Sequence, residues 1–134
     1  MASKFSNKKV VIFGASSGIG AAVAKRFAGL GAEVIVHYNG NKSGAEEVVQ
    51  AIINAGGKGH LLAGDVSQAE VAERLVNEAA AKLGRLDIVI NNAGNMFGRT
   101  AISKATDEQY RDVVDLNIGG VFFACRRAAA ILQE

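Results

Sequence analysis

The sequence predicts an α/β fold in which one domain is built around a doubly wound parallel sheet. Strand-like runs of β-branched residues alternate with helical patterns, glycines close those patterns, and a glycine-rich turn joins the first strand to the first helix. A chain of 134 residues has room for one core. We therefore expect a single domain over residues 1–134.

The expected strands are continuous apolar runs. They cover residues 10–13, 34–37, 58–62 and 86–90, of which the run at 58–62 is the weakest. Runs without polar alternation are typical of parallel strands that are buried on both faces.

Helical patterns separate and follow these strands. Apolar residues recur at helical spacing over residues 19–30, 43–55, 68–83 and 107–134. The order strand, helix, strand predicts right-handed crossovers. Gly119 and Gly120 lie inside the last pattern, where glycine is unfavourable, so we expect close packing or a local bend there.

Composition excludes several classes of partner. The chain is 49% hydrophobic and 21% charged, and its formal net charge of +2 is too small for a nucleic-acid surface. Cys125 is the single cysteine, and no cysteine and histidine grouping has the spacing of a zinc site. No apolar run approaches the roughly 20 residues of a membrane span. We expect a cytoplasmic protein with no nucleic acid, membrane or metal as partner.

The turn after the first strand, from Gly14 to Gly20, reads Gly-Ala-Ser-Ser-Gly-Ile-Gly. Glycine permits a tight turn and close approach of a phosphate, and the helix that begins at Gly18 directs unpaired N–H groups toward an anion. A plain strand-to-helix turn is the alternative. The turn predicts a bound nucleotide.

Four motifs, in matching order, resemble the short-chain dehydrogenase/reductase family. They are the glycine turn 14–20, the pair Asp65 and Val66, the Asn-Asn-Ala-Gly run at 91–94, and Asn117. The resemblance covers the whole chain, and residues 107–130 look most like carrier-protein ketoacyl reductases. It implies a partial Rossmann-like sheet of four strands in the order 3-2-1-4 with four helices, and a nicotinamide dinucleotide as cofactor.

The resemblance assigns cofactor contacts to three segments. In the glycine turn they are Gly14, Ser16, Ser17, Gly18, Ile19 and Gly20. Asp65 is placed at the adenine amino group and Val66 beside the ring, although helix capping would also explain an aspartate there. Asn91, Ala93 and Gly94 are placed near the ribose, with a generic Asn-Gly turn as the alternative.

The residues after the second strand favour NADP and leave NAD possible. An acidic residue there would bind the 2′-hydroxyl of NAD, but the sequence has Tyr38, Asn39, Asn41 and Lys42. These side chains and the serines of the glycine turn can bond a 2′-phosphate, although the arginine of many NADP-dependent relatives is missing. Phe13 also departs from the threonine that usually begins the family's glycine motif.

The expected catalytic groups are mostly outside the chain. Asn117 matches the family's catalytic asparagine, with an ordinary helical amide as the alternative. The serine, tyrosine and lysine of the family would follow Glu134, so we expect a chain truncated before its catalytic half. The Tyr-x-x-x-Lys spacing of Tyr38 and Lys42 lies in a glycine-containing loop and is interpreted as coincidence.

The remaining candidates are interpreted as structural. Tyr110 has no lysine partner, His37 and His60 have no paired carboxylate motif, and Cys125 is interpreted as core or interface filler.

We therefore expect the NAD(P)(H)-binding portion of an oxidoreductase that transfers hydride between nicotinamide and a small carbonyl or alcohol, inactive as an isolated chain. A non-catalytic nucleotide-binding or interaction module and a fragment that needs a complementing polypeptide are the alternatives. The strand at 86–90 would lack a neighbour, and helices 68–83 and 107–134 would carry apolar surface. We expect a homo-oligomer or docking of a complementary fragment.

Overall fold

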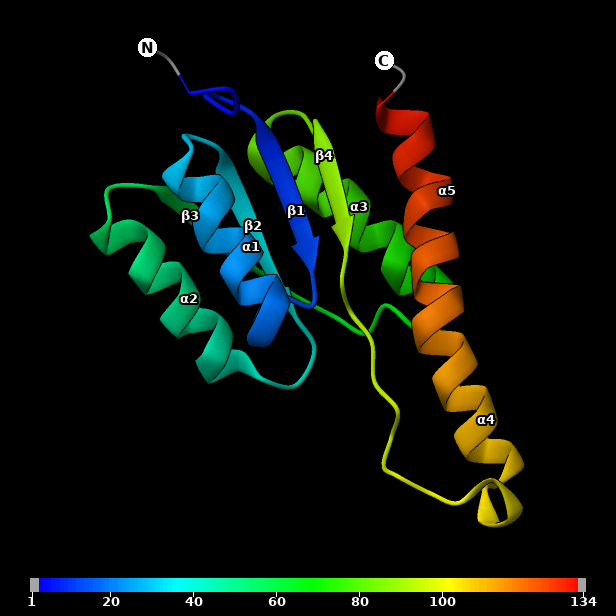
Figure 1. The fold of residues 1–134 in the computed structure, drawn as a ribbon. Coiled ribbons are helices and arrows are strands. Elements are labelled where there is room, and N and C mark those ends of the chain that lie inside the picture. Colours follow the sequence, from blue (N-terminus) through cyan, green and yellow to red (C-terminus); the bar gives the residue numbers. More distant parts are fainter. Residues whose placement is uncertain (1–2, 133–134) are drawn as a thin grey trace.

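The computed structural model describes residues 3–132 of the chain. Its strands are β1 (Lys9–Phe13), β2 (Glu33–Tyr38), β3 (Lys58–Ala63) and β4 (Ile88–Asn91). They form one parallel sheet in the order β3-β2-β1-β4 (Figure 1). The predicted α/β fold and strand order are confirmed.

Helices cover both faces of the sheet. The helices α1 (Gly18–Gly29) and α2 (Lys42–Asn54) pack on one face, and α3 (Ala69–Leu83) and α5 (Gly120–Leu132) pack on the other (Figure 1). Alternate side chains of β1 supply the two cores. Val10 and Ile12 belong to the core beneath α1 and α2, whereas Val11 and Phe13 belong to the core beneath α3 and α5. Burial on both faces explains why the strand is apolar from Val10 to Phe13.

The fourth strand begins later than the predicted run at residues 86–90 and includes Asn91. Before it, the Asp87 carboxylate accepts a hydrogen bond from the Lys9 backbone N–H at 2.7 Å. Leu86 is buried in the core beneath α3 and α5 without being part of the strand. The apolar run at residues 86–90 therefore contains one core residue that precedes the strand, followed by residues of the strand itself.

The last helical pattern forms two helices instead of one. A short 3-10 turn, η1 (Ile102–Lys104), precedes α4 (Asp107–Val114), and a π-helical turn, η2 (Asp115–Gly119), connects α4 to α5. A Cβ atom on Gly120 would lie 3.2 Å from Cγ2 and from the carbonyl oxygen of Val66. The predicted close packing is therefore present, and the π-helical turn is a local departure from an even helix. The predicted helix end at Glu134 lies outside the described residues.

Within residues 3–132, no helix has both the length and the apolar character needed to cross a lipid bilayer.

Three polar side chains connect the strands at the edge away from their carboxyl ends. Glu33 of β2 pairs through Oε2 with the Lys9 ammonium of β1, and its Oε1 lies 2.7 Å from Nε2 of His60 on β3. The hydrogen bonds from Lys9 and then from His60 hold the pKa of the Glu33 carboxyl below its ordinary value. The ionised carboxylate therefore stabilises the folded sheet.

Replacing Glu33 with glutamine should cost about 1 kcal/mol of unfolding free energy at pH 7. A carboxyl whose pKa is lowered by folding contributes stability above its unfolded pKa, and this contribution is lost as pH falls through the folded value. The difference from wild type should therefore shrink below about pH 4, as measured by urea unfolding. Glu46→Gln removes an exposed pair with Lys42 and should cost less than about 0.5 kcal/mol. Equal losses in the two variants would contradict the assignment.

Candidate functional site

A polar cleft of about 530 Å³ opens at the carboxyl edge of the sheet. Its walls come from the glycine turn after β1, from the segments after β2, β3 and β4, and from α4 and η2. In an open parallel sheet, ligands bind at this edge, where the strand order reverses. Here the reversal lies between β2 and β4, on either side of β1.

Two positions of the turn after β1 require glycine. Gly14 has a φ of +77°, and a Cβ there would lie 2.6 Å from the Ala93 Cα atom. A Cβ on Gly20 would lie 2.1 Å from the Gly14 carbonyl oxygen. The turn is therefore folded tightly against itself and against the segment after β4.

The N-terminus of α1 is open toward a ligand. Its N-cap residue, Ser17, makes no side-chain hydrogen bond to the first turn. By contrast, Asn41 caps α2 through the Gly44 N–H at 3.2 Å, and Thr106 caps α4 through the Gln109 N–H at 3.1 Å. At α1 the side chain of the N-cap residue thus leaves the first N–H groups of the helix available, and an anion can bind to them.

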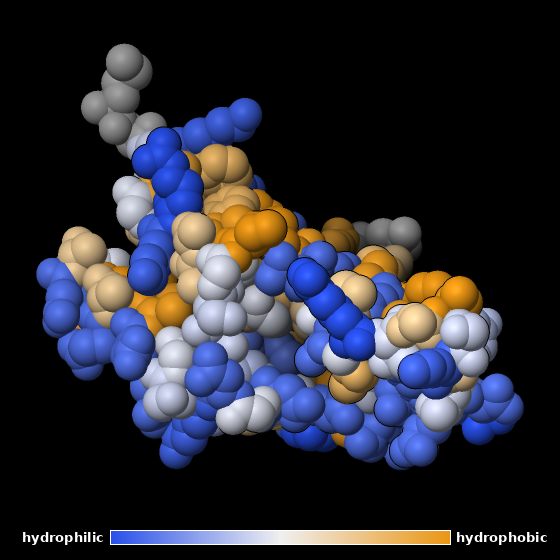
Figure 2. All heavy atoms as spheres, turned by 60° about the horizontal axis from the view of Figure 1, so that its bottom comes forward, coloured by the Kyte–Doolittle hydropathy of each residue, from blue (hydrophilic) through white to orange (hydrophobic). Residues whose placement is uncertain are grey.

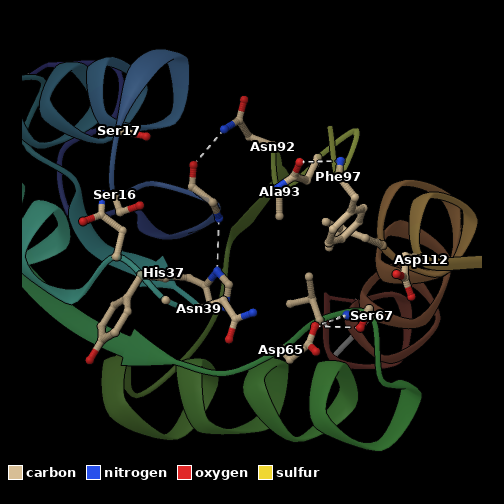
Figure 3. A pocket seen from close by; sticks show the side chains of 18 of the residues that line it. Ser16, Ser17, His37, Asn39, Asp65, Ser67, Asn92, Ala93, Phe97 and Asp112 are labelled. Atoms are coloured by element: carbon tan, nitrogen blue, oxygen red, sulfur yellow. Dashed lines mark hydrogen bonds between the residues drawn. The ribbon is translucent and has the colours of Figure 1, made fainter. Parts of the chain in front are cut away.

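Two side chains from neighbouring strands hold Gly14 in place (Figure 3). His37, from β2, accepts a hydrogen bond from the Gly14 N–H through Nδ1 at 3.0 Å. Asn92, which follows β4, donates from Nδ2 to the Gly14 carbonyl oxygen at 2.8 Å. The peptide groups on both sides of Gly14 are therefore fixed from opposite directions.

His37 was expected to be a structural histidine, and both of its ring nitrogens are hydrogen-bonded. Burial lowers the pKa of His37, so the neutral ring is favoured. That His37 lines the cleft was not predicted from the sequence. Its position near the carboxyl end of a central strand was the signal that could have indicated this.

The two asparagines of the Asn-Asn-Ala-Gly run point in different directions. Asn91, the last residue of β4, donates to the Cys125 sulfur at 3.3 Å and does not line the cleft. Asn92 lines the cleft with Ala93 and Gly94. Strand alternation accounts for the difference, because successive side chains lie on opposite faces. The ribose contact expected of Asn91 stays a prediction, and Asn92, which lines the cleft, was not among the expected contacts.

Asp65 and Val66 line the cleft after β3. The Oδ1 atom of Asp65 accepts hydrogen bonds from the Ser67 N–H at 3.0 Å and the Ser67 hydroxyl at 2.7 Å. Burial alone would raise the pKa of the Asp65 carboxyl, but the bonds from Ser67 hold it below its ordinary value. The N-cap of α3 is Gln68, so Asp65 is not the helix cap considered as an alternative.

The residues expected to choose between NAD and NADP lie at the β2 end of the cleft. Ser16, Ser17, Tyr38, Asn39 and Asn41 line it. Gly18, Ile19 and Gly20 belong to the first turn of α1 and are not part of the cleft lining.

Lys42 begins α2 outside the cleft lining, with its ammonium 3.6 Å from Glu46. Tyr38 ends β2 and Lys42 begins α2, so the Tyr-x-x-x-Lys spacing spans a turn instead of one helix face.

Asn117 lies in η2 and joins the helix to the segment after β4. Its Nδ2 donates to the carbonyl oxygens of Asn95 at 2.7 Å and Val113 at 2.8 Å. Its Oδ1 lies 2.6 Å from where a Cβ on Gly94 would be. The side chain thus positions this wall of the cleft, and its expected catalytic role remains a prediction.

The cleft also contains groups that the sequence did not single out. Asp112 and Asp115 line it from α4 and η2, and Phe97 lines it from the segment after β4 with a φ of +52°. Tyr110 is largely exposed and lies outside the lining. Residues 3–132 contain no group of three histidine, cysteine, aspartate or glutamate side chains placed to hold a metal ion.

Residues 8–134 match the sequence profile of the family described as short chain dehydrogenase. An uncharacterized oxidoreductase of Methylorubrum extorquens is 46% identical, over 98% of this chain and 53% of the relative. The 3beta-hydroxysteroid dehydrogenase 1 of Eggerthella lenta is 41% identical, over 90% of this chain and 46% of the relative. The chain thus spans about half the length of these relatives.

Solved structures with bound cofactor share the fold. A short chain dehydrogenase from Burkholderia cenocepacia in complex with NADP gives a TM-score of 0.92 at 30% identity, over 96% of this chain and 52% of that one. An NADH-dependent reductase, A1-R′, complexed with NAD gives a TM-score of 0.91 at 29% identity, over 99% of this chain and 55% of that one. A nicotinamide dinucleotide is therefore the supported cofactor class.

Proposed function

The chain belongs to the short chain dehydrogenase family, and from this premise we propose that it is the NAD(P)(H)-binding portion of an oxidoreductase. The whole protein would transfer hydride between nicotinamide and a small carbonyl or alcohol substrate. The observation that carries the proposal is the Gly14 turn, held by His37 and Asn92 beside the uncapped N-terminus of α1.

The cleft suggests how the cofactor would lie. The diphosphate would bind the N–H groups at the start of α1, where no side chain competes. The adenosine would extend toward Asp65 and Val66, and the nicotinamide ribose toward Ala93 and Gly94. The segments after β1, β3 and β4 would thus contribute to a single dinucleotide site.

We propose NADP as the preferred cofactor. No acidic side chain lines the cleft at the end of β2, where Tyr38, Asn39 and Asn41 lie with Ser16. The hydroxyl and amide groups can bond a 2′-phosphate, and no carboxylate there would repel it.

This preference can be tested by titrating the protein with NADPH and NADH and following nicotinamide fluorescence. Both should bind saturably, with NADPH binding more tightly. Asn39→Asp keeps the side-chain shape and places a negative charge near the 2′-phosphate, so it should weaken NADPH binding roughly five- to tenfold and leave NADH binding unchanged or stronger.

Asn54→Asp is the matched control, because it adds the same charge at the far end of α2, where Asn54 accepts a hydrogen bond from Gln50. It should change neither affinity by more than about twofold. Loss of NADPH binding in both variants would contradict the assignment of Asn39, and absence of binding to either cofactor would contradict the proposed function.

Residues 1–134 would form one domain that binds the cofactor but does not catalyse the reaction as an isolated chain. The chain matches about half the length of its relatives. We expect the general acid and its partner side chains in the half that the chain does not match, and Asn117 would act beside them. We place this portion in the cytoplasm, because its single cysteine suits a reducing compartment.

We also propose that the protein is a homo-oligomer. Ile118, Phe122 and Leu132 are exposed on η2 and α5. Figure 2 shows hydrophobic surface on the side of the molecule where Figure 1 places α4 and α5. Apolar surface of this kind is typical of subunit interfaces. A monodisperse monomer in light scattering would contradict this part of the proposal.

A further inference from the structure

The imidazole of His37 connects two turns that belong to different strands. The turn after β1 donates the Gly14 N–H to Nδ1 at 3.0 Å, and Nε2 lies 2.8 Å from the carbonyl oxygen of Gly64, directly after β3. The backbone of His37 reinforces the first link, because its carbonyl oxygen accepts the Ala15 N–H at 2.9 Å. A single side chain on β2 thus joins both of its neighbours in the sheet.

These contacts determine the protonation state of the ring. Gly14 can only donate its N–H, so Nδ1 must be the acceptor and carry no proton. The Gly64 carbonyl can only accept, so Nε2 must carry the proton. Only the neutral ring with its proton on Nε2 satisfies both partners. A second proton on Nδ1 would oppose the Gly14 N–H and break that hydrogen bond.

The surroundings of His37 disfavour the charged ring. The side chain is 1% exposed, and the Phe13 ring of β1 packs edge-on against it at 5.1 Å between centroids. Burial lowers the pKa of His37, while the Gly64 carbonyl and the Asp65 charge act in the opposite direction. Among the described residues, Asp65 is the ionisable group that acts on the ring through its charge.

Both turns lead directly to the proposed cofactor contacts. Gly14 begins the turn that continues to Ser16 and to the start of α1, and Gly64 precedes Asp65 and Val66. Movement of either turn would change the distance between the diphosphate end and the adenine end of the cleft.

We propose that His37 is a positioning residue whose neutral imidazole holds these two turns at the separation that a dinucleotide requires, so that protonation of the ring weakens cofactor binding. This inference rests on the proposed function. It adds a pH response that depends on one side chain, which does not itself need to touch the cofactor.

The first test is calorimetric titration with NAD⁺ from pH 7.5 down to pH 5. NAD⁺ is the suitable probe because it lacks the 2′-phosphate, whose second ionisation falls near pH 6. Affinity should be constant above pH 7 and fall as the ring becomes protonated, by up to about fivefold, which corresponds to one buried hydrogen bond. Because burial lowers the pKa of His37, the fall should lie below the ordinary histidine range. Constant affinity while the ring becomes protonated would overturn the proposal. So would tighter binding at low pH, as expected if the charged ring attracted the diphosphate.

Three variants separate positioning from other effects. In His37→Asn, Oδ1 takes the place of Nδ1 and keeps the Gly14 contact, so binding should be largely retained and become independent of pH. In His37→Gln, the amide nitrogen takes the place of Nε2 and the Gly14 contact is lost, so binding should be weaker at every pH. His60→Asn, on β3, removes the other histidine of the chain and should keep the wild-type pH dependence.

An imidazole nitrogen NMR spectrum of His60→Asn without cofactor provides an independent readout, because His37 is then the only histidine. It should show the neutral form with the proton on Nε2, and the amide signals of Gly14 and Asp65 should titrate together with the ring. Coupled titration without binding of either NAD⁺ or NADPH would support the link and overturn the proposed function. NAD⁺ binding with uncoupled amide signals would overturn the positioning role and leave the proposed function intact.

Discussion

Replacing Gly20 with alanine should destabilise the protein by about 3 kcal/mol and weaken cofactor binding roughly a hundredfold. The added Cβ would lie 2.1 Å from the Gly14 carbonyl oxygen and 2.6 Å from Nδ2 of Asn92. These two atoms form the hydrogen bond that holds the glycine turn against the segment after β4. The methyl group would therefore both displace the backbone of the turn and break the hydrogen bond between Asn92 and Gly14. Cofactor binding would be weaker because part of its free energy would be spent on returning the turn to its original conformation.

Urea unfolding and titration with NADPH measure the two effects. Gly29→Ala is the matched control, since it lies at the other end of α1 and its Cβ would meet no heavy atom within 4 Å. Alanine is favoured over glycine in helices, so this variant should be neutral or more stable by up to about 1 kcal/mol. A Gly20→Ala protein with wild-type stability and affinity would show that the turn is not packed as described.

The fold was predictable from sequence because local and tertiary requirements coincide along most of the chain. Val10 and Val11 face different cores, so a strand buried on both faces is apolar at every position. Leu86 shows where this reasoning fails. Its side chain belongs to the core although the residue precedes β4, and an apolar run does not distinguish these cases.

The site was predictable where backbone geometry determines the residue type. Gly14 and Gly20 are glycines because neighbouring backbone leaves no room for a Cβ, and this requirement is visible in the sequence as a motif. Asn92 and His37 act through side-chain direction and tertiary contact, which sequence spacing does not reveal. The same limitation applies to Asn91, whose position in the motif suggested a cofactor contact but whose side chain reaches Cys125.

Replacing Asn92 with alanine should lower stability by about 1.5 kcal/mol and cofactor affinity by about tenfold. The substitution removes the donor that pairs with the Gly14 carbonyl oxygen at 2.8 Å. Asn92→Asp should be worse, at about 2–3 kcal/mol, because a carboxylate of the same shape cannot donate and would face both that oxygen and the diphosphate with negative charge. Urea unfolding and NADPH titration measure both variants.

Asn91→Ala is the internal control for this prediction, because the two asparagines are adjacent in the chain and differ in what they contact. Asn91 donates to the Cys125 sulfur, a weak acceptor, at 3.3 Å. Its loss should cost less than about 0.5 kcal/mol and leave cofactor affinity within about twofold of wild type. If Asn91→Ala lost as much affinity as Asn92→Ala, the motif would bind through both side chains and the strand alternation argument would fail. If only Asn92 mattered, the motif would act by fixing the glycine turn, and the cofactor would be held by backbone groups that this side chain keeps in place.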